Sequence, residues 1–382
     1  MNSNVAIVSA PTLETWDWRN PWTKGIGGSE TSHIECAVRL RRRGFAIESW
    51  SPLGGIDFHD TEPPIPWYDS MGGGFRARDY KVLINYRSPE LFDTRKPKGA
   101  KWWLVAQDTD YPTLTPERIE KIDRYICLCK KHAQYTQEKY PALRGKTYIS
   151  SNGVRSELIR ELVAGREVRN PVTGVAIKPQ ERNPKRMFYA SSPDRGIKLI
   201  LENWFRIKER VPDAEIVVAY GLDNMEVIIR KMAGRDWRAE YARELESLFQ
   251  QEGVQFTGRI DQGRVYEEWL QAGVCPIFTD FPETNMICCQ EAQALGAWPV
   301  SNDLWAPGEF VQYGRKFQGV PQKSQVLLHT MLSALCDEMV ADQNTWERKD
   351  WRCEMQEWAL KQFDWERTVS QWSGWLEEDL KK

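Results

Sequence analysis

Residues 281–300 read FPETNMICCQEAQALGAWPV, and the fold prediction starts from this segment. The apolar run at 274–278 predicts a buried strand, and residues 284–295 predict a helix that ends at Gly296. Residues 298–301 then predict the next strand. A strand, turn, helix and strand in this order are typical of a parallel sheet, which binds ligands at its carboxyl edge. We therefore expect the turn before the helix to carry a binding site.

Two glutamates in this stretch are the first candidates for that site. Glu283 lies at the predicted helix start and Glu291 lies eight positions later, which corresponds to roughly 12 Å along a helix axis. The carboxyls of a glycosidase pair are closer, at about 5–9.5 Å. The separation suits two anchors that bind hydroxyls at opposite ends of an extended ligand, and the free N–H groups of the helix start favour a diphosphate between them. Hydroxyl, diphosphate and hydroxyl in this order are the layout of a nucleotide sugar.

The spacing Glu-x7-Glu, followed by Ala-x-Ala-x-Gly-Ala, resembles the retaining glycosyltransferases of family 4, which have the GT-B fold. The resemblance implies an α/β architecture of two Rossmann-like, doubly wound domains that face a cleft. It also implies that Glu283 holds the donor sugar as a catalytic residue and that Glu291 holds the ribose, with Thr284 and Asn285 in the same donor-binding set. The competing interpretation is a favourable first-turn charge at Glu283 and a solvated helix face at Glu291.

The resemblance covers nearly the whole chain, most strongly from 187 to 301, and implies its domain organisation. We expect an acceptor-side Rossmann-like domain at 1–163, a linker at 164–184, a nucleotide-sugar-binding Rossmann-like domain at 185–362 and a last helix at 363–382 that crosses back to the first domain. That helix carries an apolar stripe, which needs a surface to cover: Trp365, Val369, Trp372 and Leu376.

A glycine-rich loop, Gly25-Ile26-Gly27-Gly28, lies between the first predicted strand and the first predicted helix. Gly27 and Gly28 have no Cβ, so their backbone can approach a ligand closely, and loops of this kind cradle phosphate in many folds. A tight turn needs glycine too. Family 4 enzymes often carry Gly-Gly-x-Glu at this place, so the resemblance implies that Gly27 and Gly28 face the donor phosphates and the acceptor.

Arg195 and Lys198 lie where a predicted strand meets the helix predicted from about 197 to 210. Cations at a helix start oppose the usual dipole preference and need an anion, which indicates a phosphate. In family 4 an Arg or Lys in this loop binds the donor diphosphate, and Arg195, before Gly196, matches that position better than Lys198 does. The competing interpretation is two solvated side chains. Because these cations and the helix starts would neutralise the leaving diphosphate, neither a metal nor another cofactor is expected.

Asp108-Thr109-Asp110 follows the strand predicted at 102–107. The tripeptide matches Asp-x-Asp, which holds a metal on the diphosphate in the GT-A class of glycosyltransferases, but polar turns after strands also produce it by chance. Family 4 relatives often carry His-Asp at this edge, and Gln107-Asp108 resembles that pair with the His replaced. We therefore assign Asp108 to the acceptor or catalytic region.

Composition narrows the function classes. The 382 residues are enough for two domains, and a formal net charge of -2 gives no global basic excess for nucleic acid or an anionic membrane. We find neither a signal peptide nor a transmembrane segment, so we expect a cytoplasmic protein. The eight cysteines form no CxxC pair and indicate buried free thiols, and the four histidines argue against a His-rich zinc site.

The sequence therefore predicts a glycosyltransferase that moves a sugar from a nucleoside-diphosphate sugar to an unidentified acceptor, such as a glycan, a lipid or another hydroxyl. Retention of configuration, with same-face attack and the leaving phosphate helping to take the acceptor proton, is implied by the resemblance. Three alternatives stay open: a metal-dependent enzyme built on Asp108-Thr109-Asp110, a nucleic-acid-modifying sugar transferase, and a non-catalytic nucleotide-sugar-binding module.

Overall fold

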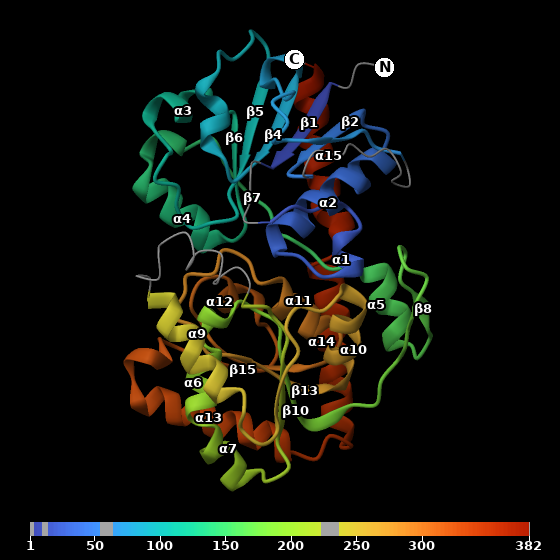
Figure 1. The fold of residues 1–382 in the computed structure, drawn as a ribbon, viewed down its shortest axis with the longest axis vertical. Coiled ribbons are helices and arrows are strands. Elements are labelled where there is room, and N and C mark those ends of the chain that lie inside the picture. The colour runs from blue at the N-terminus through green and yellow to red at the C-terminus, as the bar shows by residue number, and fades with distance from the viewer. Residues whose placement is uncertain (1–3, 10–13, 54–63, 223–236, 382) are drawn as a thin grey trace. The chain divides into compact units, whose positions relative to one another are not determined.

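The computed structural model describes residues 4–9, 14–53, 64–222 and 237–381. The chain divides into two compact units. The first unit comprises Met1–Asn20, Ile26–Gly153 and Phe363–Lys382, and the second comprises Pro21–Gly25 and Val154–Gln362. Each unit is built around its own parallel sheet (Figure 1).

The first unit contains a seven-stranded parallel sheet in the order β3-β2-β1-β4-β5-β6-β7. Its strands are β1 (Val5–Ser9), β2 (Ile47–Ser51), β3 (Trp67–Asp69), β4 (Val82–Tyr86), β5 (Lys101–Val105), β6 (Arg124–Cys127) and β7 (Thr147–Ile149). Its helices include α2 (Gly28–Arg42), α3 (Pro116–Lys121), α4 (Lys130–Lys139) and α15 (Trp365–Lys381), with α1 (Asn20–Thr23) at the passage to the second unit. All residues of β1 and β4 are buried, as is usual for central strands covered on both faces.

The second unit contains a six-stranded parallel sheet in the order β12-β11-β10-β13-β14-β15. Its strands are β10 (Asn183–Tyr189), β11 (Glu215–Val218), β12 (Val254–Phe256), β13 (Ala272–Ile277), β14 (Trp298–Asn302) and β15 (Arg315–Phe317), and β8 (Val168–Arg169) pairs with β9 (Ala176–Ile177) as a separate antiparallel hairpin. Its helices include α5 (Ser156–Val163), α6 (Ile197–Glu202), α7 (Trp204–Arg210), α9 (Trp237–Leu248), α10 (Gln262–Gln271), α11 (Ile287–Ala294), α12 (Ala306–Phe310), α13 (Gln325–Val340) and α14 (Trp346–Gln362).

Both sheets confirm the predicted fold class of two doubly wound Rossmann-like bodies. The strand order 3-2-1-4-5-6 of such sheets reverses direction between its first and fourth strands, and ligands bind outside the carboxyl ends at that switch point. The switch lies between β1 and β4 in the first unit and between β10 and β13 in the second. The loops after these strands are therefore the places where a site is expected.

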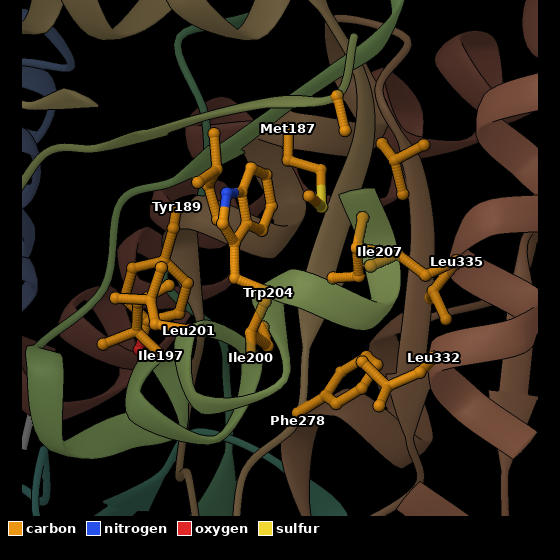
Figure 2. Packing of buried hydrophobic residues seen from close by; sticks show 14 of the residues in the cluster. Met187, Tyr189, Ile197, Ile200, Leu201, Trp204, Ile207, Phe278, Leu332 and Leu335 are labelled. Carbon is orange, nitrogen blue, oxygen red and sulfur yellow. The ribbon is translucent and has the colours of Figure 1, made fainter. Parts of the chain in front are cut away.

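A dense apolar cluster supports the second sheet from one side. Figure 2 shows Trp204 and Ile207 of α7 packed with Met187 and Tyr189 of β10 and with Leu332 and Leu335 of α13. The indole Nε1 of Trp204 donates to the carbonyl oxygen of Glu252 at 2.8 Å, so this buried polar atom is satisfied. Burial of this many large side chains fixes the register of α6 and α7 on the sheet, and with it the turn that precedes α6.

The last helix, α15, belongs to the first unit, where it packs against α2 (Figure 1). Its apolar stripe is buried: Trp365, Val369, Trp372 and Leu376. Two charged contacts secure its ends, since Glu366 Oε1 lies 2.6 Å from Arg39 Nη1 and Asp379 Oδ2 lies 2.9 Å from Arg124 Nε. No helix among the described residues is long and apolar enough to span a membrane.

The unit boundary differs from the predicted division at 163. The first unit ends at Gly153, and the following helix α5 lies in the second unit, where Ser156 Oγ donates to the carbonyl oxygen of Leu360 at 3.1 Å. The segment 164–184, predicted as a linker, carries the β8–β9 hairpin of that same unit. The difference arises because α5 is stabilised by contacts with α14, which is distant in sequence and therefore invisible to local patterns.

Candidate functional site

The loops after β10 and β13 meet at the switch point of the second sheet. Arg195 ends a short 3₁₀ helix, Pro193–Arg195, and Gly196 follows with a φ of 108°. A Cβ at Gly196 would lie 1.9 Å from the carbonyl oxygen of Phe278, just beyond the end of β13. Only glycine fits this contact, because both the backbone conformation and the available space exclude a side chain. Gly196 therefore lets the Arg195 turn lie directly against the loop that carries Glu283.

The structure brings Arg195 and Glu283 together. Arg195 Nε lies 3.1 Å from Glu283 Oε1, and Arg195 Nη1 lies 2.6 Å from Asp194 Oδ2. The guanidinium also stacks on Phe281, with its Cζ 3.3 Å from the ring centroid. The side chains of Arg195 and Glu283 are only 21% and 14% exposed, so neither is a solvated surface charge. A cation and a carboxylate thus share one half-buried place at the carboxyl edge.

The helix after Glu283 begins later than predicted, at Ile287 rather than at Thr284. Glu283 therefore precedes the helix and does not lie in its first turn. The loop is held by backbone contacts, since Ala306 N–H donates to the carbonyl oxygen of Glu283 at 3.0 Å and Asn302 Nδ2 donates to that of Thr279 at 2.8 Å. Thr284 is buried in this loop. Tertiary contacts with the loop after β14 override the local helix propensity here.

Glu291 lies inside the second unit and not on a solvated helix face. The residue is 5% exposed, and Gln262 Nε2 donates to its Oε1 at 2.8 Å. Burial raises the pKa of the Glu291 carboxyl to about 7, against the opposing effects of the Arg155 charge and the Gln262 hydrogen bond. Arg155 is itself packed over the ring of Trp22, with its Cζ 4.6 Å from the centroid. A nearly buried carboxylate with so few partners is suited to accept hydrogen bonds from a ligand.

The raised pKa of Glu291 predicts a pH-dependent stability. Between pH 4.5 and about 7 the folded state holds a proton on Glu291 that the unfolded state has released, so stability falls as pH rises through this window. A pKa shift from 4.5 to about 7 corresponds to about 3 kcal/mol. Denaturant unfolding at pH 5 and pH 8 should therefore show wild type losing about 2.5 kcal/mol relative to Glu291→Gln, because the unfolded carboxyl is already partly ionised at pH 5. Equal pH dependence of the two proteins would contradict this environment for Glu291.

Lys198 has carboxylate partners within the second unit. Its Nζ pairs with Glu244 of α9 and lies 3.6 Å from Glu202 Oε1 of its own helix. The Glu244 hydrogen bond raises the pKa of the Lys198 ammonium, against a smaller lowering by burial. In the free protein Lys198 therefore supports the packing of α6 on α9, and a contact with a diphosphate would require it to exchange these partners.

In the first unit, Asp108 follows β5 and forms a forked ion pair with Arg87. Arg87 Nε donates to Asp108 Oδ2 at 2.7 Å and Nη2 donates to Oδ1 at 3.2 Å. The backbone N–H groups of Gln107 and Asp108 both donate to the hydroxyl oxygen of Tyr111, at 3.0 and 3.1 Å. Gln107 in turn exchanges two side-chain hydrogen bonds with the buried Asn152. The turn at Asp108 is thus fixed on both sides.

The glycine loop before α2 makes room for a protein carboxylate. A Cβ at Gly27 would lie 2.3 Å from Glu30 Oε2, so the absence of a side chain lets Glu30 fold back over the loop. Gly27 caps α2 without a side-chain hydrogen bond, and Gly28 is the first residue of the helix. The negative charge favoured at this helix start is supplied at least in part by Glu30.

The two carboxylates of Asp108-Thr109-Asp110 have different partners. Asp108 pairs with Arg87, whereas Asp110 pairs with Lys139 and accepts a 2.6 Å hydrogen bond from the hydroxyl of Tyr140. Within the part of the chain that the structure describes, no group of three or more His, Cys, Asp or Glu side chains is arranged to hold a metal ion. Each carboxylate that a metal would need is engaged by a cation.

Three residues that surround the candidate site residues were not identified from the sequence alone: Arg87, Arg155 and Gln262. Arg87 carries the only usable signal, because it directly follows an apolar strand and therefore lies at a carboxyl edge. Gln262 donates a hydrogen bond to Glu291 and the charge of Arg155 acts on it, both from other elements of the second unit, and no local pattern predicts these interactions.

No family model matches the chain, and no curated protein matches it in sequence. Solved structures match it over almost its whole length. Sucrose-phosphate synthase from Thermosynechococcus elongatus is 14% identical with a TM-score of 0.66, and the match covers 99% of each chain. HepE of Anabaena in complex with UDP and glucose is 13% identical with a TM-score of 0.64, covering 98% of this chain and 99% of HepE.

A third neighbour is α,α-trehalose-phosphate synthase (UDP-forming) from Burkholderia vietnamiensis. It is 12% identical with a TM-score of 0.64, and the match covers 100% of this chain and 97% of the synthase. These neighbours are glycosyltransferases of the GT-B class. The likeness confirms the predicted GT-B fold.

Proposed function

We propose that this protein is a retaining glycosyltransferase of the family 4 type, which transfers a sugar from a nucleoside-diphosphate sugar to a hydroxyl acceptor. The pairing of Arg195 with Glu283 at the switch point of the second sheet is the observation that carries the proposal. It combines a cation for a diphosphate with a carboxylate for a sugar hydroxyl at the place where such sheets bind nucleotides. One neighbour supports it, since HepE of Anabaena was solved in complex with UDP and glucose.

In the proposed complex the second unit binds the donor. Arg195 neutralises the diphosphate, Glu283 accepts a hydrogen bond from the sugar, and Glu291 accepts from the ribose. Thr284, Asn285 and Lys198 belong to the same predicted donor-binding set. An approaching diphosphate competes with Glu283 and Asp194 for Arg195, so donor binding redistributes the present ion pairs.

The first unit is proposed to bind the acceptor with Asp108, and its loop at Gly27 and Gly28 belongs to the predicted donor-binding set, facing the donor phosphates and the acceptor. In the reaction the bond between the anomeric carbon and the diphosphate oxygen breaks, and the acceptor oxygen attacks the same face of the sugar. The acceptor proton passes to the departing phosphate oxygen, which leaves a glycoside and a nucleoside diphosphate. The protein contributes charge stabilisation and positioning. A cytoplasmic location stays a prediction.

A melting experiment tests this function without knowledge of the acceptor. A ligand that binds only the folded state raises the melting temperature, by about 2.7 kcal/mol of stability at a hundredfold excess over its Kd. UDP-, GDP- and ADP-sugars should be compared at equal concentration, with free glucose as the control. We expect one nucleotide series to shift the melting temperature and glucose to leave it unchanged. If no nucleotide shifts it, the proposed function is wrong.

Chelation tests whether the reaction needs a metal. Asp108 and Asp110 are engaged by Arg87 and Lys139, so neither carboxylate is available to a metal without losing its partner. Because charge stabilisation by side chains replaces the metal, we expect the rate of donor turnover to change by less than about twofold in EDTA. The measurement is the rate of nucleoside diphosphate release before and after EDTA. Loss of turnover with EDTA and its recovery with manganese would favour a metal held by the Asp-x-Asp pair.

A further inference from the structure

Arg87 has a backbone conformation that arginine rarely adopts. Its φ is 65°, in the left-handed region, and among the described residues only Trp305 shares a positive φ without being glycine. Arg87 directly follows β4, at the switch point of the first sheet. Residues in sparsely populated regions cost stability and persist where the surrounding structure holds them, often at functional sites.

The surrounding contacts hold this conformation firmly. Arg87 N–H donates to the carbonyl oxygen of Val105 on the neighbouring strand at 3.3 Å. The fully buried Asn85 donates from Nδ2 to the carbonyl oxygen of Ser88 at 2.6 Å, which closes the turn around Arg87. The turn directs the guanidinium toward the loops that follow β1 and β5.

The Arg87 guanidinium contacts both segments of the first unit in which the sequence predicts site residues, namely the turn at Asp108 and the start of α2 after the glycine loop. Besides its fork to Asp108, its Nη1 lies 3.2 Å from Ser29 Oγ and 3.7 Å from Glu30 Oε1 at the start of α2. Each Asp108 oxygen accepts one hydrogen bond from Arg87, and a carboxylate has about four acceptor sites, so lone pairs remain for another donor.

The arrangement is accessible to a ligand. The side chains of Arg87 and Asp108 are 39% and 44% exposed, so a polar group can approach the fork from solvent. Strained residues cluster at active sites and ligand-binding sites, where the strain holds a side chain in the geometry that function needs. A strained but accessible arginine is therefore a candidate for a functional role.

We propose that Arg87 is a positioning residue for the acceptor. It holds the Asp108 carboxylate and the first turn of α2 in one arrangement, and the remaining lone pairs of Asp108 accept the hydrogen bond of the acceptor hydroxyl as that hydroxyl approaches the sugar. This inference rests on the proposed function, because only a transfer reaction supplies the acceptor hydroxyl that Asp108 would bind.

Arg87→Gly separates a functional role from a structural one. Glycine accepts a positive φ, so the melting temperature should stay the same or rise by about 2 °C. Arg144→Gly, at an exposed position with a φ of -59°, is the control for the flexibility that glycine adds to the unfolded chain, and it should melt slightly lower. The measured rate is that of hydrolysis, with water as the acceptor, of the nucleotide sugar that raises the melting temperature of the wild-type protein most.

We expect Arg87→Gly to hydrolyse this donor at least about tenfold more slowly, because the Asp108 carboxylate loses the position from which it acts on the attacking water. The melting shift that the nucleotide induces should stay unchanged, because Asp108 does not bind the donor. In an Asp108→Asn background, Arg87→Gly should not lower the hydrolysis rate further, because the carboxylate that Arg87 positions is already absent. A melting temperature below that of Arg144→Gly, or an unchanged hydrolysis rate, would overturn the inference. A wild-type protein that no nucleotide stabilises would contradict the proposed function instead.

Discussion

Replacing Glu283 with glutamine should lower the turnover number by about 10²–10³-fold without weakening the affinity for the nucleoside diphosphate. Glu283 Oε1 lies 3.1 Å from Arg195 Nε, so the diphosphate competes with this carboxylate for the cation, and loss of the charge removes that competition. A hydrogen bond to the sugar that strengthens as the glycosidic bond breaks acts on the rate and not on ground-state binding. Glutamine keeps the shape of the side chain and removes the charge.

The experiment compares Glu283→Gln with Glu347→Gln, a variant of an exposed glutamate on α14. Steady-state rates give the turnover number, and calorimetric titration with the nucleoside diphosphate gives the affinity. Glu347→Gln should behave as wild type in both measurements, because surface substitutions of this kind have small effects. A Glu283→Gln enzyme with full turnover would remove the carboxylate from the reaction.

Replacing Gly196 with alanine should destabilise the second unit by about 3 kcal/mol or more and abolish donor binding. Two costs add at this position. The φ of 108° is unfavourable for alanine, and the new Cβ would lie 1.9 Å from the carbonyl oxygen of Phe278, which is backbone and cannot move aside like a side chain. Relief of the clash requires the turn after β10 to separate from the end of β13, which parts Arg195 from Glu283.

Gly174→Ala is the matched control for this substitution. Gly174 also has a positive φ, of 72°, but nothing lies within 4 Å of a Cβ at that position. The stability that Gly174→Ala loses should reflect the backbone conformation alone and amount to about 1 kcal/mol. Chemical denaturation of the two variants measures the difference. Equal losses at both positions would show that the turn yields to the clash and that the contact with Phe278 is not needed.

The architecture was predictable because the elements of the second sheet carry strong local patterns. The apolar run of β13, the end of the helix before Gly296 and the strand β14 lie close to their predicted positions. Gly296 has a φ of 88°, which explains its place after the helix. The glutamate spacing led to Glu283 and Glu291, which both follow β13, the first in the loop after this strand and the second in α11.

What the sequence did not reveal depends on contacts between distant segments. The helix start at Ile287 is set by the backbone contact between Ala306 and Glu283, which lies outside any local window. Glu291 accepts its hydrogen bond from Gln262 of α10 and is influenced by the charge of Arg155, and Lys198 pairs with Glu244 of α9. Local patterns thus located the charged groups, whereas their partners emerged only once the chain was folded.

The most direct test is a crystal structure of the protein with the nucleoside diphosphate that stabilises it most. We expect the ribose hydroxyls within hydrogen-bond distance of Glu291 and the diphosphate on Arg195, with Glu283 placed to accept a hydrogen bond from the sugar. A nucleotide bound away from the carboxyl ends of β10 and β13, or a ribose without contact to Glu291, would contradict it.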